Sequence, residues 1–259
     1  MSRSQFDYVS QKVEDPELLR AILEIKDGHP YYGTPRVLAK LRREGHVVNG
    51  KKIARLLKDL NLLVSRKKPT QPTYLPPRSA LPDAIHPDQI WSIDFVHDYL
   101  KNGESFRCLT AIDIFTREVP NIFASKSMAG YRPVEFLESL KGSRKLPQHI
   151  ILDNGPEFVS QPFVQWCEKN SITLHFIDPG KPVQNAYIES FNGKFRQEFL
   201  SRNKFGSISS LQDKLGDWIK FYNEERPHSS IDYMTPKEFA QEHRGVLTPK
   251  INSPVLKTG

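Results

Sequence analysis

The sequence predicts an α/β protein in which a small all-α domain precedes a larger domain, whose mixed sheet is flanked by helices. Three observations predict this class. Residues 15–60 carry repeated helix-start signals. Residues 90–97, 106–115 and 149–152 are short apolar runs of the types that favour strands. Residues 184–201 then carry apolar side chains at helical spacing.

The N-terminal segment predicts three short helices. Asp15-Pro16 combines an N-cap with proline at the first helical position, and predicts a helix to about Lys26. Thr34-Pro35 repeats the signal for a helix to about Glu44, and a third helix is expected over about residues 50–60. The third helix directs its apolar residues inward: Ile53, Leu56, Leu57 and Leu60. Its basic residues lie outside: Lys51, Lys52, Arg55 and Lys58.

The formal net charge of +7 is unevenly distributed. Residues 36–68 hold eleven Lys or Arg residues against two acids, so this segment carries +9 and the remainder of the chain −2. A basic helix that follows a short turn fits a helix-turn-helix DNA-binding domain, which we place at residues 1–66. A helical bundle with a solvated basic face is the alternative.

Residues 67–88 contain six prolines and are predicted to form a linker. A stretch so rich in proline is extended and semi-rigid, and can hold the N-terminal domain away from the next one. The alternative is that it packs over the surface of that domain. We expect the catalytic core at residues 89–205, and a C-terminal helical extension and tail at residues 206–259.

The first candidate catalytic residue, Asp94, lies in the predicted strand at residues 90–97. The Asn102-Gly103 pair between this run and the next predicts a hairpin. Aspartate is depleted in strands, which favours a functional role for Asp94 over a solvent-facing strand acid.

The second candidate, Asp153, directly follows the apolar run at residues 149–152 and opens the turn Asp153–Pro156. Ligands of open α/β sheets gather beyond the carboxyl ends of strands. Asp153 is therefore a candidate ligand residue, with an ordinary turn aspartate as the equal alternative.

The third candidate, Glu189, lies on the helix predicted over about residues 184–201. The apolar stripe of this helix consists of Ile188, Phe191, Phe195 and Phe199. Glu189 falls roughly 115° from the centre of the stripe, and a solvated polar face is the alternative. The same flank carries Asn185, Asn192 and Arg196. Gly193 costs the helix about 1 kcal/mol relative to Ala, which suggests a close neighbour there.

Three carboxylates can hold two divalent ions about 3.5–4 Å apart, the arrangement used for in-line phosphoryl displacement. Oxygen ligands suit Mg²⁺ or Mn²⁺. The chain has 30 acidic residues, so the hypothesis depends on the local structure around each acid and not on their spacing.

These segments together resemble the catalytic core of retroviral-integrase-like bacterial transposases, the insertion-sequence enzymes of the OrfB type. The resemblance covers about residues 16–241, nearly the whole chain. In the core it rests on Trp91–Val96, Leu109–Glu118, Asp153–Phe158 and Asn185–Lys194. Outside the core it rests on Tyr32–Arg36, Val48–Lys52, Tyr222–His228 and Thr235–Phe239.

The resemblance implies a ribonuclease-H-like core with a DDE triad of Asp94, Asp153 and Glu189. The triad would bind two divalent metal ions, Mg²⁺ or Mn²⁺. Asp94 would bridge both ions, with Asp153 completing one site and Glu189 the other. The activity implied is cleavage of DNA at the ends of a mobile element, followed by transfer of the freed 3′-hydroxyl into target DNA.

DNA is the partner that this activity requires, as both element ends and target. A homo-oligomer on DNA is implied, and an upstream OrfA-type subunit or fusion is a further expected partner. The candidate DNA-binding residues are Lys51, Lys52, Arg55, Lys58, Asn185, Lys194 and Arg196.

The C-terminal extension predicts two more helices. A capping-box pattern at Ser209–Gln212 begins one of them, in which Trp218 and Tyr222 fit the core better than a base-stacking platform. Thr235–Glu238 begins a final short helix. Two residues between these helices are candidates for phosphate contact: Arg226 and His228.

Several classes of protein are disfavoured by the sequence. It has no apolar run of about 18 residues for a membrane span and no apolar signal peptide at its start. Cys108 and Cys167 lie far apart, which indicates a reducing compartment, and we expect a cytoplasmic, nucleoid-associated protein. No Gly-x-x-x-x-Gly-Lys loop for ATP occurs, and no histidine pairs with cysteines at zinc-finger spacing.

Two further functions remain open on these residues. The chain could be a non-catalytic DNA-binding partner or regulator acting with an upstream transposase subunit, or a hydrolytic nuclease of the same fold. The complete set of three carboxylates favours catalysis over binding alone. Strand-transfer products would distinguish a transposase from a nuclease.

Overall fold

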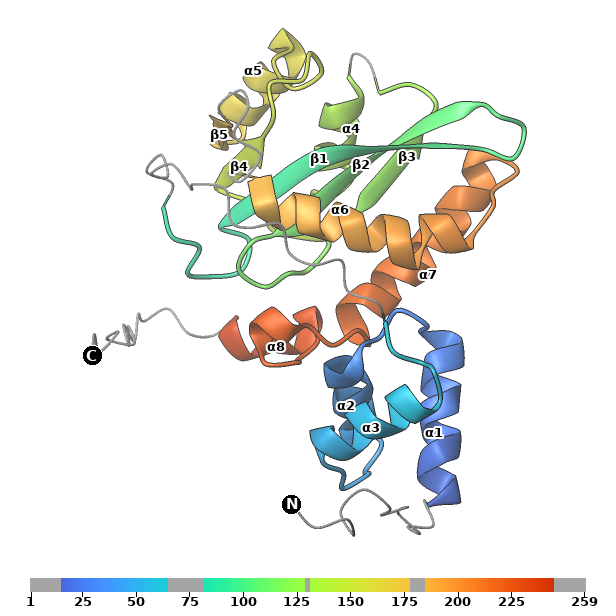
Figure 1. The fold of residues 1–259 in the computed structure, drawn as a ribbon. Helices are drawn as coiled ribbons and strands as arrows, with labels where there is room; N and C mark the ends of the chain where they lie inside the picture. Colours follow the sequence, from blue (N-terminus) through green and yellow to red (C-terminus); the bar gives the residue numbers. More distant parts are fainter. Residues whose placement is uncertain (1–14, 65–81, 129–130, 178–184, 245–259) are drawn as a thin grey trace, which may run out of the picture. The chain divides into compact units, whose positions relative to one another are not determined.

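The computed structural model describes residues 15–64, 82–128, 131–177 and 185–244. The chain forms two compact units, divided between Lys68 and Pro69. Figure 1 shows the helices and strands of both. Most of the predicted linker (residues 67–81) and the predicted tail beyond residue 244 lie outside the described residues. None of the helices within the described ranges combines the length and the apolar character needed to cross a bilayer.

The N-terminal unit consists of three helices, α1 (Pro16–Gly28), α2 (Thr34–Arg43) and α3 (Gly50–Asp59). Asp15 caps α1 by accepting the backbone N–H of Glu17, and Asn49 caps α3 through the N–H of Lys51. The three helices bury a shared apolar core: Leu18, Ile22, Val37, Leu41, Ile53 and Leu57. The predicted helices are confirmed, each ending within two residues of the expected position.

The C-terminal unit is built on a five-stranded mixed sheet with the order β3-β2-β1-β4-β5. Its strands are β1 (Ile90–Tyr99), β2 (Ser105–Asp113), β3 (Ile122–Ser125), β4 (His149–Leu152) and β5 (Thr173–Phe176). The first three pair antiparallel, whereas β4 pairs parallel with both β1 and β5. Gly103, with φ +83°, allows the tight turn of the predicted β1–β2 hairpin.

Helices cover both faces of this sheet (Figure 1). They are α4 (Arg132–Glu138), α5 (Gln161–Lys169), α6 (Ala186–Glu198) and α7 (Ile208–Glu224). A last helix, α8 (Pro236–His243), packs against α7. The buried side chains of α4 and α5 pack with Trp91 and Ile93 on one face of the sheet. The buried side chains of α6 and α7 pack with Val96 on the other face. Because side chains alternate along a strand, Ser92 and Asp94 face the same side as Val96, toward α6.

The start of α7 differs from the predicted pattern at Ser209–Gln212. The capping box is formed by Ser207 and Ser210, each side chain accepting the other's backbone N–H. The hydroxyl of Ser210 fills the role of the expected Gln, so the helix begins at Ile208. The expected core positions of Trp218 and Tyr222 are confirmed by their burial.

Arg226 and His228, the two candidates for phosphate contact, are both buried, and the structure therefore contradicts that role. The Arg226 guanidinium donates to both carboxylate oxygens of Glu198 at 2.7 Å, and its Nη1 lies 3.0 Å from His228 Nε2. Glu198 ends α6, so this ion pair joins the end of α6 to the loop after α7.

Candidate active site

Asp94 and Asp153 meet through the parallel pairing of β1 and β4. Ser92 lies opposite Ile151 in this register. Two residues further along, the same register brings Asp94 opposite Asp153, the first residue after β4. The two carboxylates therefore lie at the same end of β4, as the sequence predicts for acids beyond the carboxyl end of a strand.

Asp94 lies in a partly buried site in which its charge is unfavourable. Its Oδ1 accepts the backbone N–H of Phe95 at 2.7 Å, and its Oδ2 accepts the side-chain amide of Asn192 at 2.8 Å. Burial first, and then the charges of Asp153 and Glu189, raise the pKa of Asp94 to about 6 against the two hydrogen bonds, which lower it. The charges of both other candidate acids therefore act on Asp94, as expected if the three acids share one site.

Helix α6 runs beside β1 and is fastened to it by polar side chains. The Ser92 hydroxyl donates to the side-chain oxygen of Asn185, at the start of the helix. The side-chain oxygen of Asn192 accepts from the Thr110 hydroxyl at 2.8 Å. Near the other end, Arg196 donates to the backbone oxygen of His97 at 2.8 Å. These contacts hold Glu189, an exposed residue in the first turn of α6, beside the strand of Asp94.

The loop after β4 is organised around Asp153. The carboxylate accepts the backbone N–H of Gly155 at 3.0 Å. A Cβ atom at Gly155 would lie 2.9 Å from the Asp153 carboxylate and 3.3 Å from that of Glu157, so a larger residue would force the Asp153 carboxylate to move. The close neighbour expected at Gly193 is wrong, since a Cβ atom there would meet nothing within 4 Å.

Two residues that were not predicted as part of the site support this loop. Glu157 forms an ion pair with Arg107 of β2. The Arg107 guanidinium lies 4.0 Å from the ring centre of Phe95, which stacks on Phe158 at 4.8 Å. Glu157 lies within the Asp153–Phe158 motif, so the motif itself could have indicated it. No pattern in the sequence indicates Arg107, because this contact joins residues 50 positions apart.

The donor chemistry of the three acids fits a hard divalent cation, which prefers oxygen ligands. In the described ranges, however, no three Asp, Glu, His or Cys side chains are close enough to enclose a metal ion.

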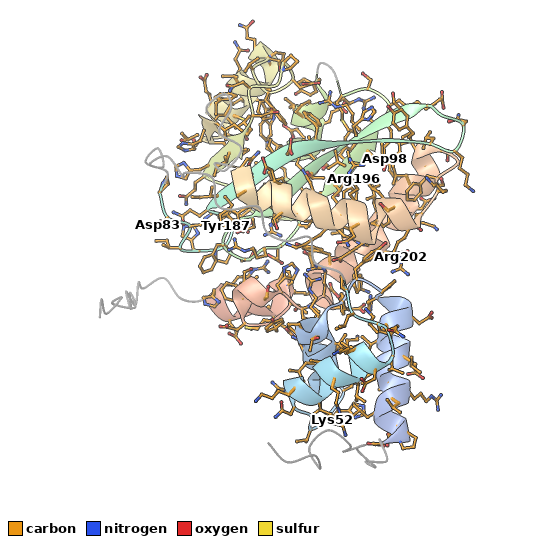
Figure 2. The ribbon with its side chains drawn as sticks, viewed as in Figure 1. Lys52, Asp83, Asp98, Tyr187, Arg196 and Arg202 are labelled. Carbon is orange, nitrogen blue, oxygen red and sulfur yellow. The ribbon has the colours of Figure 1, made fainter. Side chains whose placement is uncertain are left out.

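The candidate DNA-binding residues fall into two groups. Lys51, Arg55 and Lys58 are exposed on α3, and Lys52 is partly exposed on the same helix (Figure 2). On α6, Lys194 donates to the Ser190 hydroxyl at 2.9 Å. Arg196 lies beside Asp98, 3.7 Å away (Figure 2). Asn185 differs from the rest, since only 4% of it is exposed and its side-chain oxygen is engaged by Ser92.

Comparison with protein families gives three matches. Residues 84–182 and 170–236 match two models, each described as an integrase core domain. Residues 13–70 match a model described as an HTH-like domain. Together these matches extend over both units of the chain.

Known proteins resemble the chain along most of its length. The 31.7 kDa protein of insertion element IS407 from Burkholderia multivorans is 39% identical over 246 residues, which cover 94% of this chain and 88% of that protein. The putative transposase InsK of insertion sequence IS150 from Escherichia coli is 25% identical, covering 93% and 90%.

Among solved structures, a chain of the simian T-cell lymphotropic virus intasome in complex with PP2A regulatory subunit B56 gamma has the same fold. Its TM-score is 0.58 at 20% identity, over 92% of this chain and 80% of that one. This likeness supports the predicted ribonuclease-H-like class of the sheet domain.

Proposed function

The chain belongs to the transposases of bacterial insertion elements, and from this premise we propose that it cleaves DNA at element ends and joins the freed 3′-hydroxyl to target DNA. The observation that carries the proposal is the environment of Asp94. Its pKa is raised by burial and by the charges of Asp153 and Glu189, which supports the proposal that these three acids act together. Such clusters of perturbed carboxylates are typical of catalytic sites.

Asp94, Asp153 and Glu189 are the residues that would hold divalent cations, Mg²⁺ or Mn²⁺. When bound, two such ions activate an attacking oxygen and stabilise the leaving oxygen of an in-line phosphoryl displacement. A cation would also remove the repulsion that the acids experience without one. No nucleotide cofactor is required, because each joining step breaks one phosphodiester bond and forms another.

The chain's other residues orient the acids and hold DNA. Asn192 orients Asp94 through its amide, and Asn185 fixes the start of α6 on β1. We propose that Lys194 and Arg196 contact phosphates near the acids, and that Lys51, Lys52, Arg55 and Lys58 of α3 contact DNA from the N-terminal unit. The enzyme would work as a homo-oligomer on DNA, with an upstream OrfA-type segment as an additional subunit or fusion.

A non-catalytic DNA-binding role is the second candidate function. No three described Asp, Glu, His or Cys side chains lie close enough together to hold a metal ion, and a role in DNA binding alone requires no such group. The two functions differ in one measurable property, since only a catalytic chain produces nicked and joined DNA.

The test is a nicking and joining assay in Mg²⁺ or Mn²⁺ on DNA that carries the element's own ends. The unmutated chain is compared with Glu189→Gln and with the control Glu225→Gln, which alters an exposed acid at the end of α7. We expect joined products from the unmutated chain and the control, and none from Glu189→Gln, although all three bind DNA. Equal activity of Glu189→Gln would refute the assignment of the triad.

A further inference from the structure

The excess positive charge of the chain lies on α2, α3 and the turn between them. Residues 34–59 hold eight Lys or Arg residues against two acids, Glu44 and Asp59, which leaves an excess of six positive charges. Glu44 lies 3.9 Å from Lys40 of the same helix. The two helices pack side by side (Figure 1), so this basic surface is continuous and suits a polyanion such as DNA.

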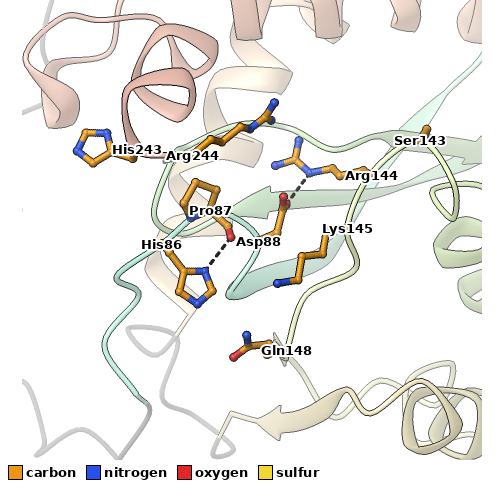
Figure 3. Close-up of a pocket in the computed structure, with 9 residues that line it drawn as sticks. All are labelled: His86, Pro87, Asp88, Ser143, Arg144, Lys145, Gln148, His243 and Arg244. Atoms are coloured by element: carbon orange, nitrogen blue, oxygen red, sulfur yellow. Dashed lines mark hydrogen bonds and ion pairs between the residues drawn. The ribbon is translucent and has the colours of Figure 1, made fainter. Parts of the chain in front are cut away.

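The cavity beside the start of β1, in the C-terminal unit, is balanced in charge by contrast (Figure 3). Arg144 lies 2.6 Å from Asp88 and 2.9 Å from Glu118. Its Nη2 is also 3.6 Å from Asp113, and Arg244 lies 3.4 Å from Glu118. All three acids are buried, so the two arginines of this cavity are neutralised within the fold.

A fully exposed apolar side chain, Val47, lies in the turn between the two basic helices. The next most exposed large apolar residue that the structure describes, Ile85, is 62% exposed. Single apolar residues are ordinary on protein surfaces, but Val47 has two cations at the end of α2 and two at the start of α3 close to it in sequence: Arg42, Arg43, Lys51 and Lys52. A duplex bound by these cations would come close to the valine.

The turn that carries Val47 is fixed to both helices. Gly45 takes φ +90°, and its N–H donates to the backbone oxygen of Arg42 at 3.1 Å. The Arg42 guanidinium donates to the backbone oxygen of Val48 at 3.5 Å. On the other side of the turn, Asn49 caps α3. Valine is also stiff about χ1, so this side chain would lose little conformational freedom on contact with a ligand.

The chemistry of DNA limits what an exposed valine can contact there. Phosphates and most groups at the base edges are polar, and the apolar group that a base pair presents in the major groove is the C5-methyl of thymine. In helix-turn-helix proteins the start of the second helix approaches these base edges. The turn that leads into α3 would therefore approach them together with the proposed DNA contacts of α3.

We propose that Val47 contacts the methyl group of a thymine in the major groove, and so selects one base pair of the DNA that the N-terminal unit binds. This inference rests on the proposed DNA-binding role of α3. The cations would position the duplex through its phosphates, and Val47 would add the sequence information that phosphate contacts do not carry.

The first test measures binding of the full chain to element-end duplexes in which single thymines are replaced by deoxyuridine. This replacement removes the methyl group and keeps the base pair. The unmutated chain should lose about 4-fold in affinity at one thymine, the effect expected of one methyl-sized apolar group. Val47→Ala should bind the thymine duplex about 4-fold more weakly. Replacement of that thymine should then cost Val47→Ala less than about 2-fold, because both changes remove the same contact.

Leu23→Ala is the matched control, since it shortens another exposed apolar side chain of the same unit, on α1. It should bind like the unmutated chain and keep the full loss at deoxyuridine. The salt slope of binding should not change in Val47→Ala, because no phosphate contact is removed. Thermal unfolding verifies that both variants are folded.

The proposal would be overturned if every deoxyuridine replacement had the same effect on the unmutated chain and on Val47→Ala. Equal weakening on all duplexes, together with lost self-association in sedimentation, would instead assign Val47 to a contact between copies of the chain.

A double alanine variant of Lys52 and Arg55 separates this failure from failure of the proposed function. If its salt slope equals that of the unmutated chain, the DNA-binding role of α3 is wrong and the inference falls with it. If its slope falls while Val47→Ala shows no dependence on the methyl group, only the contact of Val47 is wrong.

Discussion

Asn192 donates its side-chain amide to Oδ2 of Asp94 at 2.8 Å, so the helix that carries Glu189 also orients the first acid of the proposed triad. The oxygen of the same amide lies 2.8 Å from the Thr110 hydroxyl. The amide is thereby held in one orientation, with its N–H groups toward Asp94.

Asn192→Ala is expected to reduce strand cleavage and joining about 10- to 100-fold, the usual effect of removing a residue that orients a metal ligand. The Mg²⁺ concentration required for half-maximal activity should rise, while DNA affinity should not change. Asn102→Ala, at an exposed hairpin amide, is the control and should keep full activity. A loss of activity with no change in the Mg²⁺ requirement would argue against an orienting role.

Asp94→Asn is expected to stabilise the metal-free protein at neutral pH. The pKa of Asp94 rises from 3.8 to about 6 on folding, so the unfolded chain ionises first as the pH increases. The metal-free, unmutated protein therefore loses stability as the pH rises from about 4 to about 6. Above this window the substitution should add on the order of 1 kcal/mol to the free energy of unfolding.

Urea unfolding in a chelator, at several pH values, measures this difference. This difference should shrink toward zero only as the pH falls below about 3, where Asp94 is protonated in both the folded and the unfolded state. A difference that stays constant with pH would mean that the charge of Asp94 is not its source.

Arg226→Met is expected to lower the free energy of unfolding by about 3–5 kcal/mol, because it leaves the buried Glu198 carboxylate without its partner. The double variant Arg226→Met, Glu198→Met should recover part of this loss, since no charge is then left buried. Urea unfolding of the two single variants and the double variant measures the coupling. If the change in the free energy of unfolding of the double variant equals the sum of the two single changes, the two side chains do not interact.

Replacing Lys52 and Arg55 together with alanine is expected to weaken DNA binding and to reduce its salt slope by about 0.9 for each phosphate that the chain no longer neutralises. Binding of a duplex at several salt concentrations measures both effects. Arg20→Ala, on the exposed face of α1, is the control and should leave the slope unchanged. An unchanged slope in the double variant would remove α3 from the DNA interface.

The elements that carry the acids could be predicted because their signals are local. The Asp15-Pro16 and Thr34-Pro35 signals mark the starts of two helices of the N-terminal unit, and the Asn102-Gly103 pair marks the hairpin after Asp94. Alternation along β1 then assigns Asp94 to one face of the sheet. Each of these signals depends on residues close together in the sequence, so tertiary packing does not override it.

The supporting contacts of the site could not be predicted, because they depend on which distant residues packing brings together. Arg107 meets Glu157 across 50 residues, and Arg226 finds Glu198 only once α6 and α7 are packed. In isolation, Arg226 has the same features as a surface arginine near DNA. Only its burial shows that its charge is used within the fold.

The fastening of α6 along β1 ties two of the candidate acids to one another. Asp94 and Glu189 lie on a strand and a helix that Asn185 and Asn192 join. Asp153 instead begins the loop in which Glu157 forms an ion pair with Arg107 of β2. A substitution at Arg107 would therefore displace Asp153 alone among the three acids, and would leave the spacing of Asp94 and Glu189 unchanged.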